Sequence, residues 1–122
     1  MKKTLSRFVL LEHTGHPDDP EGRHFDLLLE QADACKTWRL ADIPRVEGPA
    51  VVSTQLRDHR LFWLDRLEGE VSGGRGFARR VDSGSYVYLN TTSANEERVV
   101  ELTGETISGV LTITKTEACL SQ

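Results

Sequence analysis

Apolar and polar side chains alternate in short runs along most of the chain, and turn-forming residues separate these runs. Period-two alternation is typical of β-strands, and scarcely any stretch repeats its apolar residues every 3.6 positions over three turns. The pattern therefore predicts a mostly β protein with little helix. The expected strands are Arg7–His13, Arg23–Glu30, Lys36–Ala41, Ala50–Arg57, Leu61–Asp65, Gly76–Val81, Ser85–Thr91, Arg98–Leu102 and Ile107–Thr114.

The segments between these runs are rich in Gly, Pro, Asn, Asp and Ser, which end strands and form turns. The sequence DSGS at 82–85 stands between two alternating runs and predicts a hairpin turn. The longest irregular connection is expected at 13–23, HTGHPDDPEGR. About eight short strands must close on themselves or pair as two sheets, because open edges promote aggregation. We therefore expect a compact β-barrel, closed or partly open.

The length of 122 residues suffices for one domain with its own core and leaves no room for a second domain of ordinary size. We expect a single domain over 1–122, with its core at about 6–114. No apolar run approaches the roughly 20 residues of a membrane-spanning helix, and the first apolar stretch ends at Glu12, too early for a secretory signal. The expected protein is a cytoplasmic monomer without a membrane partner.

Cysteine content and charge exclude two further classes of protein. Cys35 and Cys119 lack the spacing of a zinc knuckle and the density of a disulfide scaffold, so both thiols are expected to be reduced. A net charge of −4 argues against broad adhesion to nucleic acid, which depends on cations that displace counterions. Six arginines among four acidic residues form either a local anion site or a mixed-charge surface. They are Arg57, Arg60, Arg66, Arg75, Arg79 and Arg80.

His24 and Asp26 share one face of an expected strand, because alternate side chains of a strand point the same way. If the strands ending at His13 and beginning near His24 are antiparallel neighbours, the three side chains converge. Two imidazoles and a carboxylate suit a divalent transition metal and leave coordination positions open. The alternative is structural, with His13 at a surface strand end, His24 hydrogen-bonded in the interior and Asp26 in solvent.

The remaining histidines and the aromatic pair 62–63 have several possible roles. His59 could be a further ligand, a general acid, a cation that binds a phosphate oxygen, or merely the end of a strand. His16, in a loop beside Pro17, is expected to face solvent rather than to bind a metal. Phe62 and Trp63 are core residues or a stacking platform. His24, Asp26 and His59 also fit the facial triad of non-haem iron oxygenases, although their separation is short for a jelly roll.

Seven short motifs follow one another along the chain. They are RFVLLEH (7–13), HFDLLLE (24–30), KTW (36–38), DHRLFW (58–63), LEG (67–69), GRG (74–76) and DSGSY (82–86). Their order resembles the 3′-phosphoesterase module of bacterial DNA ligase D end-joining proteins, which also occurs as a stand-alone protein. The resemblance extends from about residue 6 to residue 114.

This resemblance implies a compact β-barrel that uses manganese, with zinc or another transition ion as alternatives. The implied reaction removes a 3′-phosphate or a 3′-terminal ribonucleotide from a DNA end in repair. By position, His13, His24 and Asp26 match the family's metal ligands, and His59 matches its active-site histidine. The candidate catalytic residues are therefore His59, His24 and Asp26, and Glu30 has a supporting role. The implied partners are DNA or RNA–DNA 3′ ends and a DNA ligase or end-joining protein.

Two positions depart from the family pattern. Leu28 replaces an arginine that would contact the phosphate, and leucine cannot bind a phosphoryl oxygen. Trp63 replaces a tyrosine, and its indole cannot act as a phenolic acid. The alternative function is therefore a catalytically degenerate metal- or nucleic-acid-binding module of a DNA repair assembly.

Other cations could supply the contact that Leu28 lacks. The candidates are Arg57, Arg60, Arg75 and His16. The substrate-binding residues expected from the resemblance are Arg57, Arg60, Trp63 and Arg75.

Overall fold

The computed structural model describes residues 6–92 and 97–122, and this part of the chain is mostly β, as predicted. It contains nine strands and one short 3₁₀ helix, η1. The elements are β1 (Ser6–His16), β2 (Asp19–Glu30), β3 (Cys35–Leu40), β4 (Val51–His59), η1 (Leu61–Leu64), β5 (Glu68–Glu70), β6 (Phe77–Thr92), β7 (Glu97–Gly104), β8 (Ser108–Ile113) and β9 (Glu117–Ser121).

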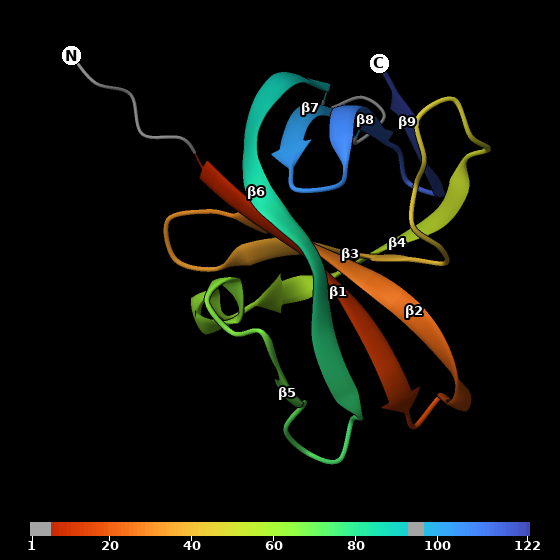
Figure 1. The fold of residues 1–122 in the computed structure, drawn as a ribbon, viewed down its shortest axis with the longest axis vertical. Coiled ribbons are helices and arrows are strands. Elements are labelled where there is room, and N and C mark those ends of the chain that lie inside the picture. The colour runs from red at the N-terminus through yellow and green to blue at the C-terminus, as the bar shows by residue number, and fades with distance from the viewer. Residues whose placement is uncertain (1–5, 93–96) are drawn as a thin grey trace.

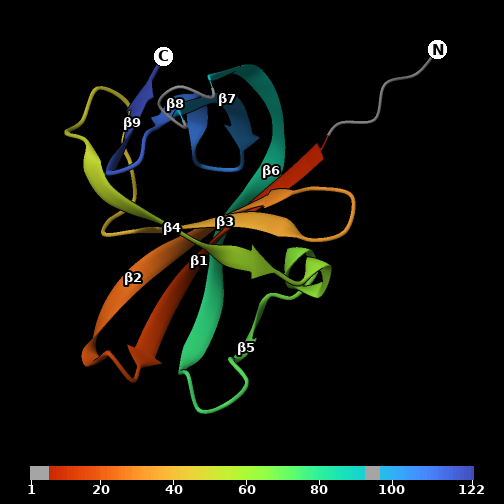
Figure 2. The same cartoon turned by 180° about the vertical axis from the view of Figure 1, so that it is seen from behind.

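The strands form one antiparallel sheet in the order β1-β2-β3-β4-β9-β8-β7-β6-β5. Because β1 also pairs with β6, eight strands close into a ring, and β5 lies outside it along β6 (Figures 1 and 2). The ring is uneven: β1 pairs along most of its length, whereas β4 and β9 pair only at Val51–Ala118 and Val52–Glu117. The predicted barrel is therefore confirmed, with a narrow seam between β4 and β9.

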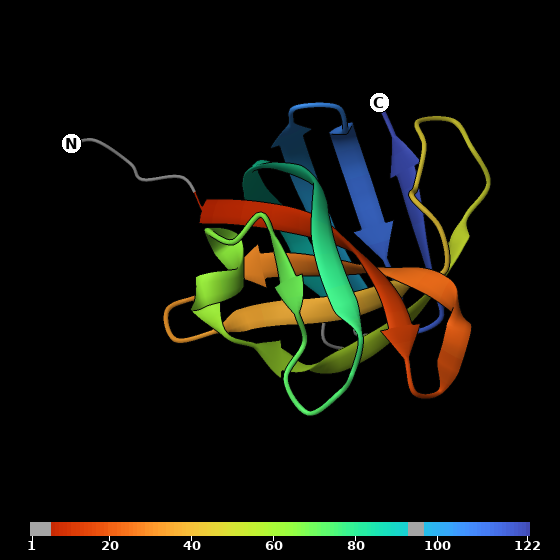
Figure 3. The same ribbon diagram turned by 60° about the horizontal axis from the view of Figure 1, so that its bottom comes forward.

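Alternate residues of β1 and β2 face two different apolar cores. Phe8, Leu10 and Leu27 belong to the main core inside the ring, together with side chains of β7, β8 and β9. The opposite face carries a second cluster, formed by Val9, Leu11, Leu28, Cys35, Trp63, Leu64 and Ala78. Figure 3 shows β7, β8 and β9 on one side of β1 and β2, with η1 and β5 on the other. Burial of both faces explains why FVLL and LLL are uninterrupted apolar runs.

The hairpin predicted at DSGS is wrong, because β6 runs through it without a turn. Asp82 is buried, and its carboxylate accepts hydrogen bonds from the backbone N–H groups of Ser83 and residues 105–107 at 2.8–3.2 Å. A side chain at Gly84 would collide with the Thr103 carbonyl of β7. These two residues therefore fasten the β7–β8 turn to β6 where β6 passes from β1 to β7.

Other element boundaries also differ from the prediction. The apolar stretch from Leu61 is the helix η1 rather than a strand, since a run of four apolar residues has no period that separates the two. The strands β5 and β9 were not predicted. The expected long connection at 13–23 is a tight hairpin, because β1 continues to His16 and β2 begins at Asp19.

Two further expectations concern the cysteines and the membrane. Cys35 and Cys119 form no disulfide among the described residues, and Cys35 is buried whereas Cys119 is exposed. Among the described residues there is no helix with the length and apolar character needed to cross a membrane.

Candidate metal centre

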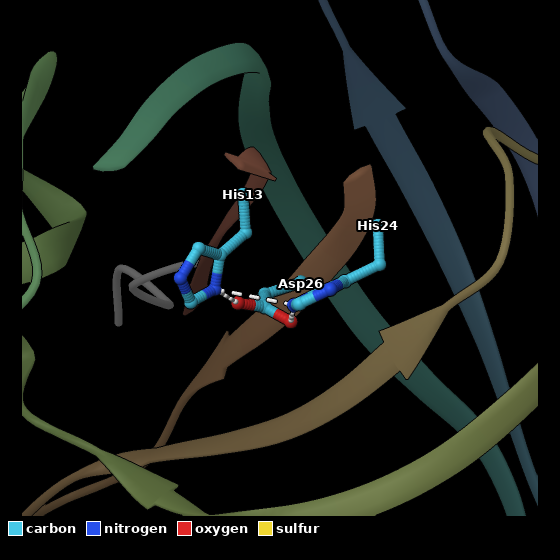
Figure 4. Close-up of side chains that lie close together, drawn as sticks. All are labelled: His13, His24 and Asp26. Atoms are coloured by element: carbon cyan, nitrogen blue, oxygen red, sulfur yellow. Dashed lines mark hydrogen bonds and ion pairs between the residues drawn. The ribbon is translucent and has the colours of Figure 1, made fainter. Parts of the chain in front are cut away.

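His13, His24 and Asp26, here called the triad, converge as predicted. His13 of β1 and His24 of β2 are direct cross-strand partners, and Asp26 follows two residues later on the same face. All three side chains are buried, and Figure 4 shows the carboxylate of Asp26 between the two imidazoles. They lie on the face of the sheet that carries the second cluster, so the structural alternative with Asp26 in solvent is wrong.

The spacing of the triad atoms fits a shared ion. His13 Nδ1 lies 3.2 Å from Asp26 Oδ2 and 3.1 Å from His24 Nε2, and His24 Nε2 lies 3.4 Å from Asp26 Oδ1. Ligands bonded at about 2.1 Å to one ion are separated by about 3.0 Å in octahedral and about 3.4 Å in tetrahedral geometry. Asp26 offers a different oxygen to each imidazole, and one ligand atom from each of the three residues lies within 4.8 Å of the other two, so the triad could hold a metal ion.

The backbone carbonyl of Arg75 fixes the orientation of the His13 ring. His13 Nε2 lies 2.6 Å from this oxygen, and only an N–H group can form such a bond, so Nε2 carries a hydrogen. In neutral His13 the lone pair then belongs to Nδ1, which faces His24 and Asp26. A metal-binding histidine commonly donates its other ring N–H to a carbonyl in this way. The turn that contains Arg75 packs tightly on β1, since a side chain at Gly76 would collide with the Thr14 carbonyl.

Asp26 carries a buried negative charge. Burial alone would raise its pKa, but the imidazoles of His13 and His24 outweigh burial and lower the pKa to about 2. Hydrogen bonding to Asp26 in turn raises the pKa of His13 above its usual 6.5, although burial opposes the shift. Asp26 Oδ1 is buried and has no hydrogen-bond partner among the described residues. An orphaned carboxylate oxygen beside two imidazole nitrogens is a second indication of a cation site.

These shifts predict a stability maximum for the metal-free protein between about pH 4 and about pH 6.5. His13 binds its proton more tightly in the folded protein than in the unfolded chain. Its contribution to the stability of the fold is therefore complete below pH 6.5 and is lost as the pH rises through its raised pKa. Asp26 holds its proton less tightly when folded, so its contribution is lost as the pH falls from 3.8 towards 2. Thermal unfolding in chelator, followed by circular dichroism, measures the profile.

The His13→Gln variant is the control for this profile. It should lose the decline on the alkaline side, because no group at position 13 then titrates near neutrality. A wild-type profile that is flat between pH 6.5 and 9 would show that the His13–Asp26 pair contributes nothing to folding.

His16 lies beside the triad, although it was expected to face solvent. Its side chain is only 19% exposed, and its ring centroid lies 5.5 Å from that of His13 and 6.0 Å from that of His24. His16 Nδ1 accepts the backbone N–H of Asp18 at 3.1 Å, so Nε2 is the ring atom that can donate. His16 lies beside the triad because β1 extends past Thr14 to His16 instead of ending at His13.

A groove of about 1050 Å³ opens next to the triad. Thr14, the chain neighbour of His13, and Arg75, whose carbonyl holds His13, form its border on the side of the triad. All four residues predicted to bind substrate line this groove, as does His59. The charged and aromatic side chains of its walls are Arg57, Asp58, His59, Arg60, Phe62, Trp63, Arg66, Glu70, Arg75 and Phe77.

His59 lies in the groove and does not contact the triad. It pairs with Cys35 of β3, which is four residues from Arg39, the partner of Asp26. At about 3.3 Å per residue, His59 is displaced by about 13 Å along the sheet from Asp26. His13, rather than His59, completes the cluster with His24 and Asp26, so the oxygenase-type triad is not formed in this structure.

Leu28 and Trp63, the two departures from the family pattern, belong to the same apolar cluster. Leu28 is 0% exposed and Trp63 is 7% exposed. The two side chains are thus joined by apolar packing. Glu30 accepts hydrogen bonds from Arg7, from its backbone N–H at 2.8 Å and from its guanidinium at 3.2 Å, and the supporting role expected for it stays a prediction.

Arg39 is a residue of this region that the sequence analysis did not identify. It is the cross-strand partner of Asp26. Arg39 follows Thr37 by two positions and Cys35 by four, so alternation alone would have placed the three side chains on one face of β3.

Comparison with protein-family models gives no match to this chain, and comparison with curated proteins gives none either. The resemblance carried by the seven motifs therefore stays an expectation.

Proposed function

We propose that the chain is a divalent-metal phosphoesterase that removes a 3′-phosphate or a 3′-terminal ribonucleotide from DNA ends. The observation that carries the proposal is the buried triad, whose ligand atoms lie within 4.8 Å of one another beside a groove with four arginines. Arginines attract a phosphate backbone, and an ion at the border of the groove would meet the terminal phosphate. The ordered motifs support the same activity.

Manganese is the proposed ion, with zinc or another transition ion as alternatives. Two imidazoles suit zinc, iron and manganese, and the carboxylate of Asp26 favours the harder of these ions. When bound, the ion supplies a positive charge that neutralises a phosphate oxygen and lowers the pKa of a coordinated water. His13, His24 and Asp26 hold it, and the Arg75 carbonyl keeps His13 oriented.

The groove residues would bind and orient the nucleic-acid strand. Arg57 and Arg60 place cations on one wall, and Arg75 places a third near the triad. His16 can donate a hydrogen bond through Nε2 to a substrate oxygen close to the triad. His59 would bind or protonate an oxygen farther along the groove, which limits its general-acid role to a substrate that extends that far.

The proposal is tested with pure protein, manganese and a DNA primer that ends in a 3′-phosphate or a 3′-ribonucleotide. The expected result is release of inorganic phosphate or nucleoside, because the proposed ion would lie at the primer end. His24→Ala should abolish release, whereas Arg45→Gln, in the exposed loop before β4, should leave it unchanged. No release at high protein concentration with manganese or zinc would contradict the phosphoesterase proposal.

The second candidate function is a metal- or nucleic-acid-binding module of a DNA repair assembly that has lost catalysis. It is favoured by the packing of Leu28 in the same apolar cluster as Trp63, which leaves no cation at position 28 and no phenolic hydroxyl at position 63. This candidate predicts that the protein binds manganese and a 3′-phosphate primer without cleaving it. An active wild-type protein would rule it out. A ligase or end-joining protein is the proposed partner in either case.

A further inference from the structure

Arg39 projects from the sheet on the same face as the triad. It is the Cα partner of Asp26 in the antiparallel pairing of β2 and β3, and directly opposed residues place their side chains on one face. Thr37 and Cys35, the preceding residues of β3 on this face, are 0% exposed. Arg39 thus lies where the second cluster ends and the triad begins.

The guanidinium of Arg39 has no partner among the described residues. Its Nε is buried without a hydrogen bond, and Arg39 forms no ion pair with the side chains that the structure describes, which do not include those of residues 1–5, 19–21 and 90–96. Asp26 is its cross-strand neighbour, but the Asp26 carboxylate is turned towards the two imidazoles (Figure 4). By contrast, Arg23 and Arg79 both pair with Glu12, at 2.8 and 3.0 Å. A partly buried cation without a partner is costly, and binding of an anion removes this cost.

The charges of the site match a phosphate monoester. A divalent ion held by the triad would keep about one positive charge beside Asp26, and Arg39 adds another. A terminal phosphate monoester carries about two negative charges near neutral pH, whereas an internal diester carries about one. The planar guanidinium can also donate two parallel hydrogen bonds to phosphate oxygens.

We infer that Arg39 binds an oxygen of a terminal phosphate monoester whose neighbouring oxygen lies on the ion held by the triad, and that it selects monoesters over diesters. This inference rests on the function proposed above. The phosphate contact that Leu28 cannot make is thereby assigned to Arg39 of β3, the strand that pairs with β2, rather than to the arginines of the groove.

The test is calorimetric binding of thymidine 3′-monophosphate and of its methyl ester to the manganese-loaded full chain. Wild type should bind the monoester about tenfold more tightly than the diester, because the second charge is matched by Arg39. Arg39→Gln should weaken monoester binding about 10- to 100-fold and remove the preference. Inorganic phosphate, which lacks the nucleoside, should show the same dependence on Arg39.

Manganese affinity separates this role from a structural one. Arg39→Gln should bind manganese as tightly as wild type or more tightly, since it removes a positive charge beside the ion. Arg45→Gln, which removes an exposed arginine of the loop between β3 and β4, should match wild type in every measurement. If Arg39→Gln does not fold, Arg39→Lys replaces it, and several-fold weaker monoester binding with unchanged manganese affinity is expected.

Two results would overturn the inference and are distinguishable. Unchanged monoester affinity in the folded Arg39 variant overturns it and leaves the phosphoesterase proposal standing. A wild-type protein that binds no manganese overturns both.

Discussion

Leu28→Arg is expected to lower the free energy of unfolding by about 3–5 kcal/mol, because it places an unpaired charge in an apolar core. Leu28 is 0% exposed and belongs to the second cluster with Leu11 and Trp63. An arginine there would either stay buried in the apolar cluster or push η1 away from β2. Urea unfolding followed by tryptophan fluorescence measures the change, because Trp63 reports on this cluster.

Leu28→Met is the matched control for this substitution. It keeps the volume and the apolar character of the side chain, so a cost below about 1.5 kcal/mol is expected. A Leu28→Arg protein as stable as wild type would mean that position 28 opens to solvent, and the apolar packing against Trp63 would then be wrong. The expected loss of unfolding free energy means that the second cluster of this chain does not accommodate an arginine at position 28.

Asp26→Asn is expected to weaken manganese binding by on the order of a hundredfold or more. Asp26 supplies the only negative charge of the triad, and an amide oxygen neither neutralises the ion nor holds protonated His13. The amide would also place an N–H₂ group near two imidazole nitrogens that should face the ion. Electron paramagnetic resonance of free manganese, or calorimetry, measures the affinity.

Asp58→Asn is the control for Asp26→Asn, because Asp58 is an exposed acid in the neighbouring groove. It should bind manganese as wild type does. If Asp58→Asn lost affinity and Asp26→Asn did not, the ion would bind in the groove and not at the triad.

The triad could be predicted from the sequence because its geometry is local. Once two apolar runs that follow each other along the chain are taken as antiparallel neighbours, His13 lies opposite His24 without knowledge of any other strand. Asp26 follows from the period of two. The mostly β fold class was predicted from the alternation of apolar and polar residues. The barrel was predicted because unpaired strand edges promote aggregation.

Contacts distant in sequence could not be predicted from alternation. Asp82 and Gly84 look like turn residues, but β7 and the turn after it lie against them and use them inside a strand. Arg39 is an ordinary strand arginine until the register of β2 and β3 places it opposite Asp26. The cluster that buries Leu28 depends on η1, whose apolar run has no period of its own.

The central claim is that His13, His24 and Asp26 bind one cation together, and a ¹H–¹⁵N NMR titration with manganese tests it most directly. Paramagnetic broadening falls steeply with distance from the ion. Substoichiometric manganese should therefore broaden the amide signals around residues 13, 24 and 26 first, while those of β7 and β8 stay sharp. Uniform broadening, or broadening that begins at the exposed acids of β5, would contradict a metal centre at the triad.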